Sequence, residues 1–263
     1  MKRIFLTGAS SGIGRATAEV LVARGHEVWG TSRNPDRVPK LDRLHPLALD
    51  LTDRNSVRAA LDQALTAAGA IDVVINNAGS GFFGAAESLP MEELQRQFQT
   101  LVFGHIEICH RALEAMQRQG SGLIINVTSL VAELPVPYMA CYNAAKSAMA
   151  SYTMSLQLEL APTKIRLVDL QPGDIKTAFN DVVITGRTDN ARIQQAWRVS
   201  DGNMKKAPEP EVVARKIADV IESANPPPRV IVGDVFQTKI APVIDRLLPQ
   251  RMRLWGLRQY YKI

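Results

Sequence analysis

Short apolar runs alternate with longer helical patterns along the whole chain. Seven runs rich in Val, Ile and Leu show little polar alternation, which is typical of strands in a sheet covered on both faces. We predict strands at Arg3–Thr7, Glu27–Ser32, Pro46–Leu49, Ile71–Asn76, Gly122–Thr128, Ile165–Gln171 and Val230–Gly233. Between these runs, apolar residues recur at spacings of three and four, as they do on amphipathic helices.

The segment before the fourth strand shows the helical pattern clearly. Val57, Leu61 and Ala64 recur at helical spacing, and Asp53 stands where an N-cap residue is expected. The repeated strand–helix order predicts an α/β fold, a Rossmann-type doubly wound parallel sheet of about seven strands with helices on both faces. No internal repeat or linker interrupts the pattern, so residues 1–263 are expected to form one domain.

The connection Ala178–Lys206 does not fit the alternation, because it is long for a compact domain. Such connections often act as lids over a binding site. The segment carries many apolar side chains, namely Phe179, Val182, Val183, Ile184, Ile193, Trp197, Val199 and Met204. They favour either a lid that contacts a bulky lipophilic substrate or simple packing on the domain, and the sequence does not separate the two.

A basic tail, Ala241–Ile263, is the second segment outside the pattern. It holds four of the five net positive charges of the chain, from Arg246, Arg251, Arg253, Arg258 and Lys262 against Asp245. Because the excess is confined to one segment, it does not favour nucleic-acid binding. Cations mixed with Trp255 and Tyr260 are compatible with peripheral contact to an anionic membrane, or with covering a neighbouring subunit or the substrate entrance.

Length and composition restrict the class of protein. The chain has 263 residues, of which 46% are hydrophobic, enough for one domain with a substantial core. No run of 18 apolar residues indicates a membrane-spanning helix, and the N-terminal apolar run is too short for a signal peptide. Cys109 and Cys141 have neither metal-site nor disulfide spacing, so we expect buried free thiols, no metal and a reducing cytoplasmic location.

A glycine-rich turn lies between the first strand and the first helix. Glycines there let the backbone bend sharply and approach a pyrophosphate, while the helix N-terminus supplies N–H groups and a positive dipole end. The spacing G-x-x-x-G-x-G differs from the more common G-x-G-x-x-G. The predicted cofactor contacts in this turn are Gly8, Ser10, Ser11, Gly12, Ile13 and Gly14.

The end of the second strand predicts which dinucleotide is bound. An NAD site normally places an acidic residue here to accept from the ribose 2′-hydroxyl, and this chain has none. Ser32 and Arg33 stand there instead, a hydroxyl and a guanidinium that suit a 2′-phosphate. We therefore predict NADP(H), although Arg33 in isolation also fits a solvated loop residue.

Three residues form a candidate reaction centre. Ser129 follows the fifth strand, Tyr142 lies thirteen residues later, and Lys146 lies four after that, on the same helix face as Tyr142. A tyrosine has a reference pKa of about 10, and a neighbouring ammonium is expected to lower it. Tyr142 then exchanges a proton with an alkoxide or alcohol, while Ser129 holds the substrate oxygen.

These motifs together resemble the short-chain dehydrogenase/reductase family across about the first 235 residues. The matching elements are TGASSGIG at Thr7–Gly14, Asp50-Leu51-Thr52, NNAG at Asn76–Gly79, Ser129, Tyr142-x-x-x-Lys146 and Pro172-Gly173 with Thr177. The resemblance implies catalysis by Ser129, Tyr142 and Lys146, with Tyr142 and Lys146 also at the cofactor. The further cofactor contacts that it implies are Asp50 and Leu51 at the adenine, Asn77, Ala78 and Gly79, with Asn76, at the ribose side, and Pro172, Gly173, Ile175 and Thr177 at the nicotinamide.

One position departs from the family pattern. The family commonly has asparagine in an Asn-Val-x-Gly pattern, and this chain has Leu101 there. By the resemblance, that asparagine helps to keep a water that links the lysine to solvent. Leucine has no side-chain donor or acceptor, although a water could still bind the backbone carbonyl.

Several functions remain open at this point. The first is reduction by NADPH of a lipophilic ketone or aldehyde, as in the steroid- and retinol-dehydrogenase-like branch that the chain loosely resembles. The second is the reverse oxidation of an alcohol. The third is a NADP(H)-sensing binding protein with little turnover, which Leu101 favours and the intact Ser129, Tyr142 and Lys146 oppose. We expect a homo-oligomer in each case.

Overall fold

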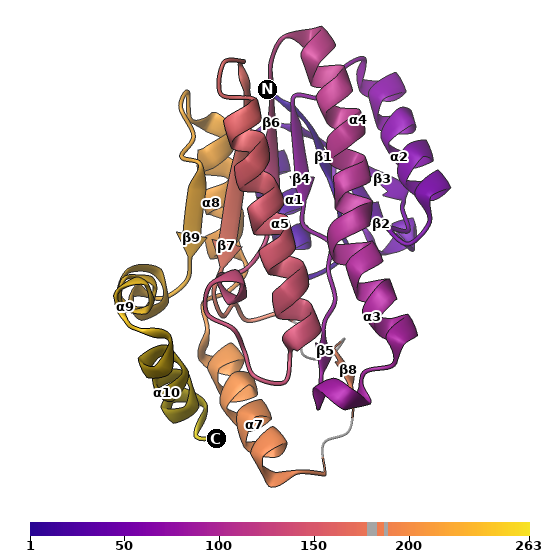
Figure 1. The fold of residues 1–263 in the computed structure, drawn as a ribbon. Helices are drawn as coiled ribbons and strands as arrows, with labels where there is room; N and C mark the ends of the chain where they lie inside the picture. Colours follow the sequence, from indigo (N-terminus) through magenta and orange to yellow (C-terminus); the bar gives the residue numbers. More distant parts are fainter. Residues whose placement is uncertain (178–182, 187–188) are drawn as a thin grey trace.

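The computed structural model describes residues 1–177, 183–186 and 189–263. A seven-stranded parallel sheet forms its centre, with the strand order β3-β2-β1-β4-β6-β7-β9 (Figure 1). The strands are β1 Arg3–Leu6, β2 Glu27–Ser32, β3 Leu44–Ala48, β4 Val73–Asn76, β6 Gly122–Val127, β7 Ile165–Pro172 and β9 Arg229–Val232. The predicted doubly wound α/β sheet is confirmed.

Alternate residues of each central strand enter two different cores. Ile4 and Leu6 of β1 pack with one core, and Phe5 between them packs with the other. All three are fully buried. Because side chains alternate along a strand and helices cover both faces of the sheet, most positions in these strands are apolar, as the sequence pattern predicted.

Helices cover both faces. On one side lie α1 Gly12–Ala23 and α8 Glu211–Glu222, and on the other lie α2 Arg54–Ala68, α4 Gly104–Gln119 and α5 Ala140–Glu159. Asp53 caps α2 as predicted, since its side chain accepts from the backbone N–H of Asn55. In the part of the chain that the structure describes, the other helices before the tail are η1 Pro35–Arg37, η2 Ala86–Ser88, α3 Met91–Phe98, η3 Gln99–Phe103, η4 Leu130–Ala132 and α7 Ala191–Lys206.

The connection after β7 has structure that the sequence pattern did not predict. Two short strands, β5 Phe82–Phe83 and β8 Ile184–Thr185, pair in parallel outside the main sheet. The predicted lid residues Phe179 and Val182 lie outside the described residues. The other end of the connection forms α7, which lies at the C-terminal side of the sheet (Figure 1).

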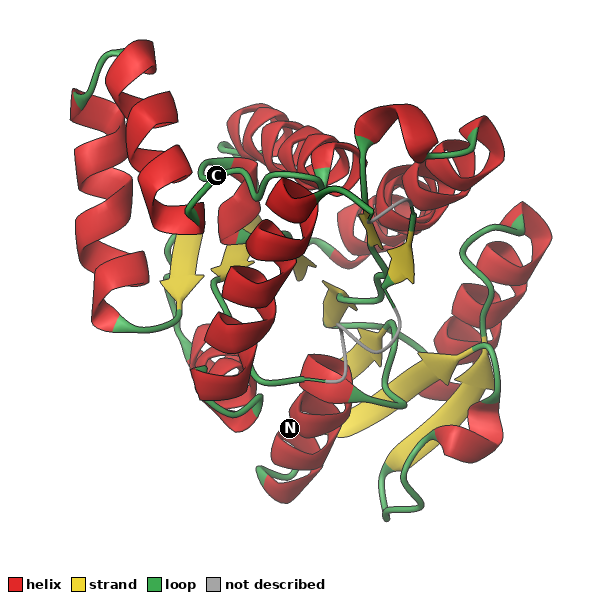
Figure 2. Ribbon diagram, turned by 90° about the horizontal axis from the view of Figure 1, so that it is seen from below, coloured by secondary structure: helices red, strands yellow, loops and turns green. Residues whose placement is uncertain are grey.

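The chain ends in a pair of helices beyond the sheet edge. After β9 come η5 Phe236–Ile240, α9 Ala241–Leu247 and α10 Gln250–Tyr261, which lie beside one another beyond β9 (Figures 1 and 2). Among the described residues, no helix is long and apolar enough to cross a membrane. Both cysteines are buried and free, as expected.

Candidate active site

The glycine turn is shaped to hold an anion at the start of α1. Gly8 and Gly12 have φ values of +76° and +51°, in the left-handed region that favours glycine. A Cβ on Gly14 would lie 2.0 Å from the Gly8 carbonyl oxygen, so no larger residue fits. Ser11, the N-cap residue, makes no side-chain cap hydrogen bond, and the first turn of α1 has no acidic residue. The helix therefore offers its N-terminal N–H groups to a phosphate, which fits a dinucleotide.

A threonine at the end of β1 ties this turn to the neighbouring strand. The Thr7 hydroxyl accepts from the N–H groups of Asn77 at 2.8 Å and Ala78 at 3.0 Å. Asn77 also donates to the Thr7 carbonyl at 2.9 Å. These hydrogen bonds place Asn77 and Ala78 beside Gly8. The family pattern suggests this arrangement, whereas the spacing of the residues along the chain does not.

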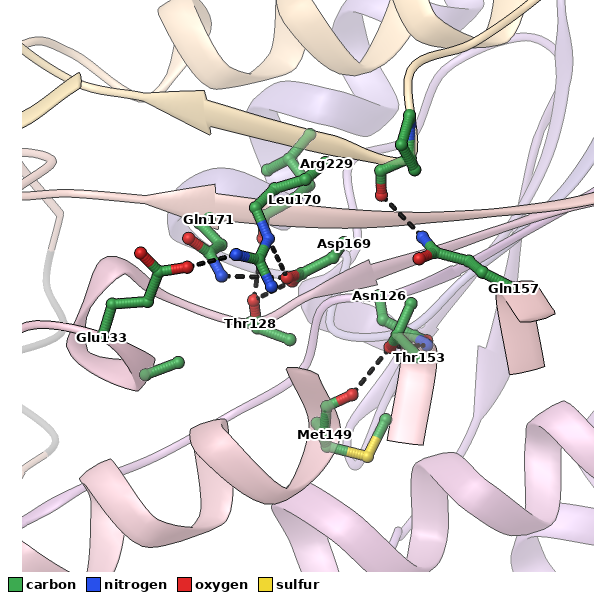
Figure 3. Close-up of polar contacts among 12 residues, drawn as sticks. Asn126, Thr128, Glu133, Met149, Thr153, Gln157, Asp169, Leu170, Gln171 and Arg229 are labelled. Carbon is green, nitrogen blue, oxygen red and sulfur yellow. Dashed lines mark hydrogen bonds and ion pairs between the residues drawn. The ribbon is translucent and has the colours of Figure 1, made fainter. Parts of the chain in front are cut away.

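Asn76, at the end of β4, makes its hydrogen bonds inside the domain. Its side chain is buried, and its amide donates to Asn126 at 2.8 Å and to the Cys109 sulfur at 3.2 Å. Asn126 in turn donates to the Thr153 hydroxyl of α5 (Figure 3). Alternation along β4 turns this side chain toward α4 and α5, where it supports the sheet, which is one of the two roles that the resemblance implies for Asn76.

The adenine end of the site contains the candidates for nucleotide selectivity. Arg33 is exposed, and Ser32 beside it is half-buried and accepts from the N–H of Asn34 at 3.2 Å. Asp50 accepts from both the backbone and the hydroxyl of Thr52, and these hydrogen bonds, helped by the charge of Arg33, lower its pKa against the effect of burial. Leu51 is buried behind Asp50. Arg33 is thus close enough to Asp50 to act on the same end of the dinucleotide.

The segment after β7 closes the opposite side of the turn. The Thr177 side chain faces Gly12, because a Cβ on Gly12 would lie 3.4 Å from it. Ile175 is buried in the core. The sequence did not predict that Gln237 of η5 packs against Gly173, in the space that a side chain at that position would fill. The Gln237 side chain also accepts a hydrogen bond from the backbone N–H of Asp174 at 3.0 Å. The end of the chain therefore supports the predicted nicotinamide segment.

Ser129, Tyr142 and Lys146 converge where β6 meets α5. The Ser129 hydroxyl donates to the Pro172 carbonyl at 3.3 Å and is hydrogen-bonded to Tyr142. The Lys146 ammonium donates to the Val127 carbonyl at 2.8 Å and lies 5.8 Å from the centre of the Tyr142 ring. The three side chains predicted from spacing are thus brought together by contacts between β6, β7 and α5.

The pKa of Tyr142 does not follow the sequence expectation. Burial raises the pKa of Tyr142 to about 12, and its hydrogen bond with Ser129 opposes this only in part. Burial also lowers the pKa of Lys146 to about 8, against the attraction of Asp169. The expected lowering of the tyrosine pKa by the ammonium is therefore wrong here, because removal from water disfavours both charged forms. Tyr142 keeps its proton at neutral pH and is set up as a donor.

The sequence analysis missed a buried histidine close to Lys146. His105 of α4 is 2% exposed, its Nε2 lies 3.4 Å from the Thr7 hydroxyl, and its ring is hydrogen-bonded to the Leu101 carbonyl. Burial, with a smaller contribution from the charge of Lys146, lowers the pKa of His105 to about 3. Leu101 itself is buried against Gly79. His105 therefore competes with any water for the carbonyl oxygen at the family's asparagine position.

An apolar cluster covers the other face of Tyr142. Its buried members come from β5, the loop before α5, the β8 strand region and α7, namely Phe83, Met139, Val183, Ile193 and Ala196. The Trp197 ring is tilted against the Phe83 ring, with ring centres 4.7 Å apart, and Ile263 packs on the same cluster. Val183, Ile193 and Trp197 of the predicted lid thus pack on the domain and form a wall beside Tyr142. Contact of this wall with a lipophilic substrate stays a prediction.

A charged network behind the site was also missed. Asp169 of β7 accepts from Thr128, from Gln171 at 2.8 Å and from Arg229 at 2.9 Å, and Arg229 also pairs with Glu133 (Figure 3). Asp169 is 2% exposed. These residues lie far apart in the sequence, so only the register of β6, β7 and β9 brings them together.

Comparison with known proteins gives consistent results. A family model described as short chain dehydrogenase matches residues 2–187. A 3-ketodihydrosphingosine reductase of Bacteroides thetaiotaomicron is 33% identical over 99% of this chain and 98% of its own. Among solved structures, a short-chain dehydrogenase from Streptomyces avermitilis superimposes with a TM-score of 0.84 at 27% identity, covering 99% of this chain and 97% of that one. A 3-ketoacyl-(acyl-carrier-protein) reductase from Brucella melitensis, complexed with NADH, gives 0.74 at 27% identity over 88% and 96% of the two chains.

Proposed function

Because the chain belongs to the short-chain dehydrogenase/reductase family, whose members are oxidoreductases with a nicotinamide cofactor, we propose that it reduces a lipophilic ketone or aldehyde with NADPH. The observation that carries the proposal is the position of Tyr142, which is partly buried against an apolar wall and hydrogen-bonded to Ser129, with a pKa raised to about 12. A tyrosine that keeps its proton at neutral pH suits the reductive direction, in which a carbonyl oxygen must be protonated.

Each residue of the site has its own role in the proposed reaction. Ser129 hydrogen-bonds the carbonyl oxygen of the substrate and Tyr142 gives it a proton, while Lys146, fixed on the Val127 carbonyl, holds positive charge beside the phenol. When bound, the nicotinamide supplies the hydride. The glycine turn, with Thr177 opposite, holds the dinucleotide, and the apolar cluster excludes water from the reacting carbon.

The apolar wall also supports the substrate class. Phe83, Met139 and Trp197 surround Tyr142 with hydrophobic surface, which favours an alkyl chain next to the reacting carbonyl. A relative that matches nearly the full length is named for reduction of 3-ketodihydrosphingosine, so a long-chain keto compound of this kind is the first substrate to assay. The test is NADPH consumption with this ketone, with short polar ketones as the comparison.

The preference for NADPH rests on Ser32 and Arg33. Arg33→Ala is expected to raise the KM for NADPH about 10-fold to 100-fold, because a charge-assisted hydrogen bond to the 2′-phosphate is lost. The KM for NADH should change little. Arg37→Ala, a charge removed from the adjacent exposed turn, is the matched control. A natural enzyme that prefers NADH would reject the assignment of Arg33.

A second candidate function is a NADP(H)-binding protein with little turnover. It is favoured by Leu101, which stands at the position of the family's asparagine, and by the hydrogen bond that His105 makes to the Leu101 carbonyl. Titration with NADPH separates the candidates when combined with the ketone panel. Binding without turnover of any carbonyl compound would establish the second candidate.

A further inference from the structure

Exposed apolar side chains are concentrated in the last part of the chain, residues 235–263, here named the helical tail. Among the described residues, ten of the 16 large hydrophobic residues that are exposed lie in it. They are Val235, Phe236, Ile240, Val243, Ile244, Leu247, Met252, Leu254, Trp255 and Tyr260. A concentration of exposed apolar side chains in one segment is typical of an interaction site, whereas single exposed apolar residues are ordinary.

The exposed residues follow helical spacing through η5 and α9. Phe236, Ile240, Val243 and Leu247 are separated by four, three and four residues, so they share one face of a nearly continuous helix. Leu247 at the end of this face is 78% exposed. The pattern is that of an amphipathic helix, but the apolar side faces outward instead of the core.

Positive charge accompanies the apolar face. The helical tail contains six cations and one acidic side chain, Asp245, which is already paired with Arg253. On α10, Arg251, Trp255 and Arg258 lie at positions i, i+4 and i+7, so the indole lies between two guanidinium groups on one face. Lys239 also lines a surface cleft of about 480 Å³ together with Arg215 and Lys216. The surface therefore combines apolar residues, an interfacial aromatic residue and unbalanced positive charge.

The helical tail is attached firmly to the rest of the domain. Tyr261 is buried, Tyr260 accepts from the Asn203 side chain of α7 at 2.8 Å, and Ile263 packs on the apolar cluster beside Tyr142. Gln237 anchors the other end on Asp174. The outward face is thus presented by a fixed pair of helices, which lies next to α7 in Figure 1.

We propose that the helical tail docks on the surface of an anionic phospholipid bilayer. Apolar residues enter the boundary between head groups and acyl chains, Trp255 lies at that boundary, and the arginines contact lipid phosphates. A second copy of the chain is a poorer occupant, because a two-fold interface would place this positive surface against itself. The proposal goes beyond the proposed reductase activity and does not depend on it.

Co-sedimentation of the full-length protein with vesicles tests the proposal. We expect binding to phosphatidylcholine vesicles that contain phosphatidylglycerol, weaker binding to pure phosphatidylcholine, and a decrease with added salt. Leu247→Ser should lower the affinity about tenfold through lost apolar contact. Arg251→Gln and Arg258→Gln should each lower it about fivefold.

Matched controls keep the result specific to this surface. Leu158→Ser on α5, where the residue is 74% exposed, and Arg118→Gln at the end of α4 should leave vesicle binding unchanged. Trp255→Phe should retain binding but lose the fluorescence quenching by brominated lipids that the natural protein shows. Equal binding to neutral vesicles, or no binding, would overturn the proposal. A change of oligomeric state in Leu247→Ser without any effect on vesicles would assign the surface to a second copy. None of these measurements uses turnover, so failure of the reductase proposal is detected separately.

Discussion

Two groups of buried polar side chains meet at residues 127–129, and they differ in how their charges are stabilised. In the group around Asp169, the carboxylate receives hydrogen bonds from Thr128, Gln171 and Arg229. In the group around Tyr142, the protonation of Lys146 and His105 is decided mainly by removal from water. The first group satisfies its charges and stabilises the sheet edge, whereas the second keeps groups with displaced pKa values available for chemistry.

Alternation along one strand end separates the two groups. Thr128 turns toward Asp169, and Ser129 turns toward Tyr142. The groups are nevertheless coupled, because the negative charge of Asp169 raises the pKa of Lys146 and so partly offsets its burial. The ion network around Asp169 therefore helps to set the charge of Lys146, the candidate catalytic lysine.

The largest expected effect concerns the proton donor. Tyr142→Phe should lower kcat about 10²-fold to 10⁴-fold, because the general acid is lost while the apolar packing of the ring is kept. NADPH affinity, measured by fluorescence titration, should remain nearly unchanged. Near-normal turnover in this variant would show that Tyr142 is not the donor.

Stability measurements should distinguish the two groups. Arg229→Met is expected to lower the free energy of unfolding by about 3 kcal/mol, because it leaves the Asp169 carboxylate buried without its cation. Lys146→Met should abolish turnover but change stability by less than about 1 kcal/mol, or raise it, because it removes a buried cation. Denaturant unfolding measures both. Arg24→Met, which breaks an exposed ion pair, is the control and should cost less than about 1 kcal/mol. Similar losses in the Arg229 and Lys146 variants would remove the distinction.

The low pKa of His105 predicts acid sensitivity. The unfolded chain binds a proton at this residue below about pH 6.5, whereas the folded protein does so only near pH 3. The contribution is therefore fully present above pH 6.5, and stability falls as the pH drops from 6.5 toward 3, by at most about 1.4 kcal/mol per pH unit.

Replacing the histidine isolates this contribution. His105→Asn should flatten the pH dependence of unfolding in that window, while His110→Asn, an exposed residue on the same helix, should keep it. An unchanged slope in the His105 variant would assign the acid sensitivity to other groups, such as the carboxylates or His26, whose pKa is also lowered by burial.

The smallest expected effect concerns Leu101. Leu101→Asn should raise kcat by a few-fold at most, because a weakened proton relay costs less than a missing donor. His105 still occupies the backbone carbonyl at this position, so Leu101→Asn combined with His105→Ala should give the larger gain. Solvent isotope effects on kcat provide the measurement. Fast turnover without an isotope effect in the natural protein would show that the relay is not limiting.

The fold and much of the site were accessible from the sequence, for different reasons. Strand positions followed from apolar runs, and the largest difference, at Leu44–Ala48, was a shift of one or two residues at a sheet edge. The candidate catalytic residues and the glycine turn were predicted from local spacing and from the family resemblance. The network of Asp169, Arg229 and Glu133 did not, since its members come from separate elements and have no sequence pattern.

By itself, the sequence determined the order of strands and helices, the glycine turn and the identity of Ser129, Tyr142 and Lys146. These depend on local periodicity, on backbone freedom and on short spacings within one helix. Only the tertiary structure decided that burial raises the pKa of Tyr142, that His105 reaches the Leu101 carbonyl and that Asn76 bonds to Asn126. Desolvation and hydrogen bonding depend on which elements pack together, and residues distant in the chain supply most of those contacts.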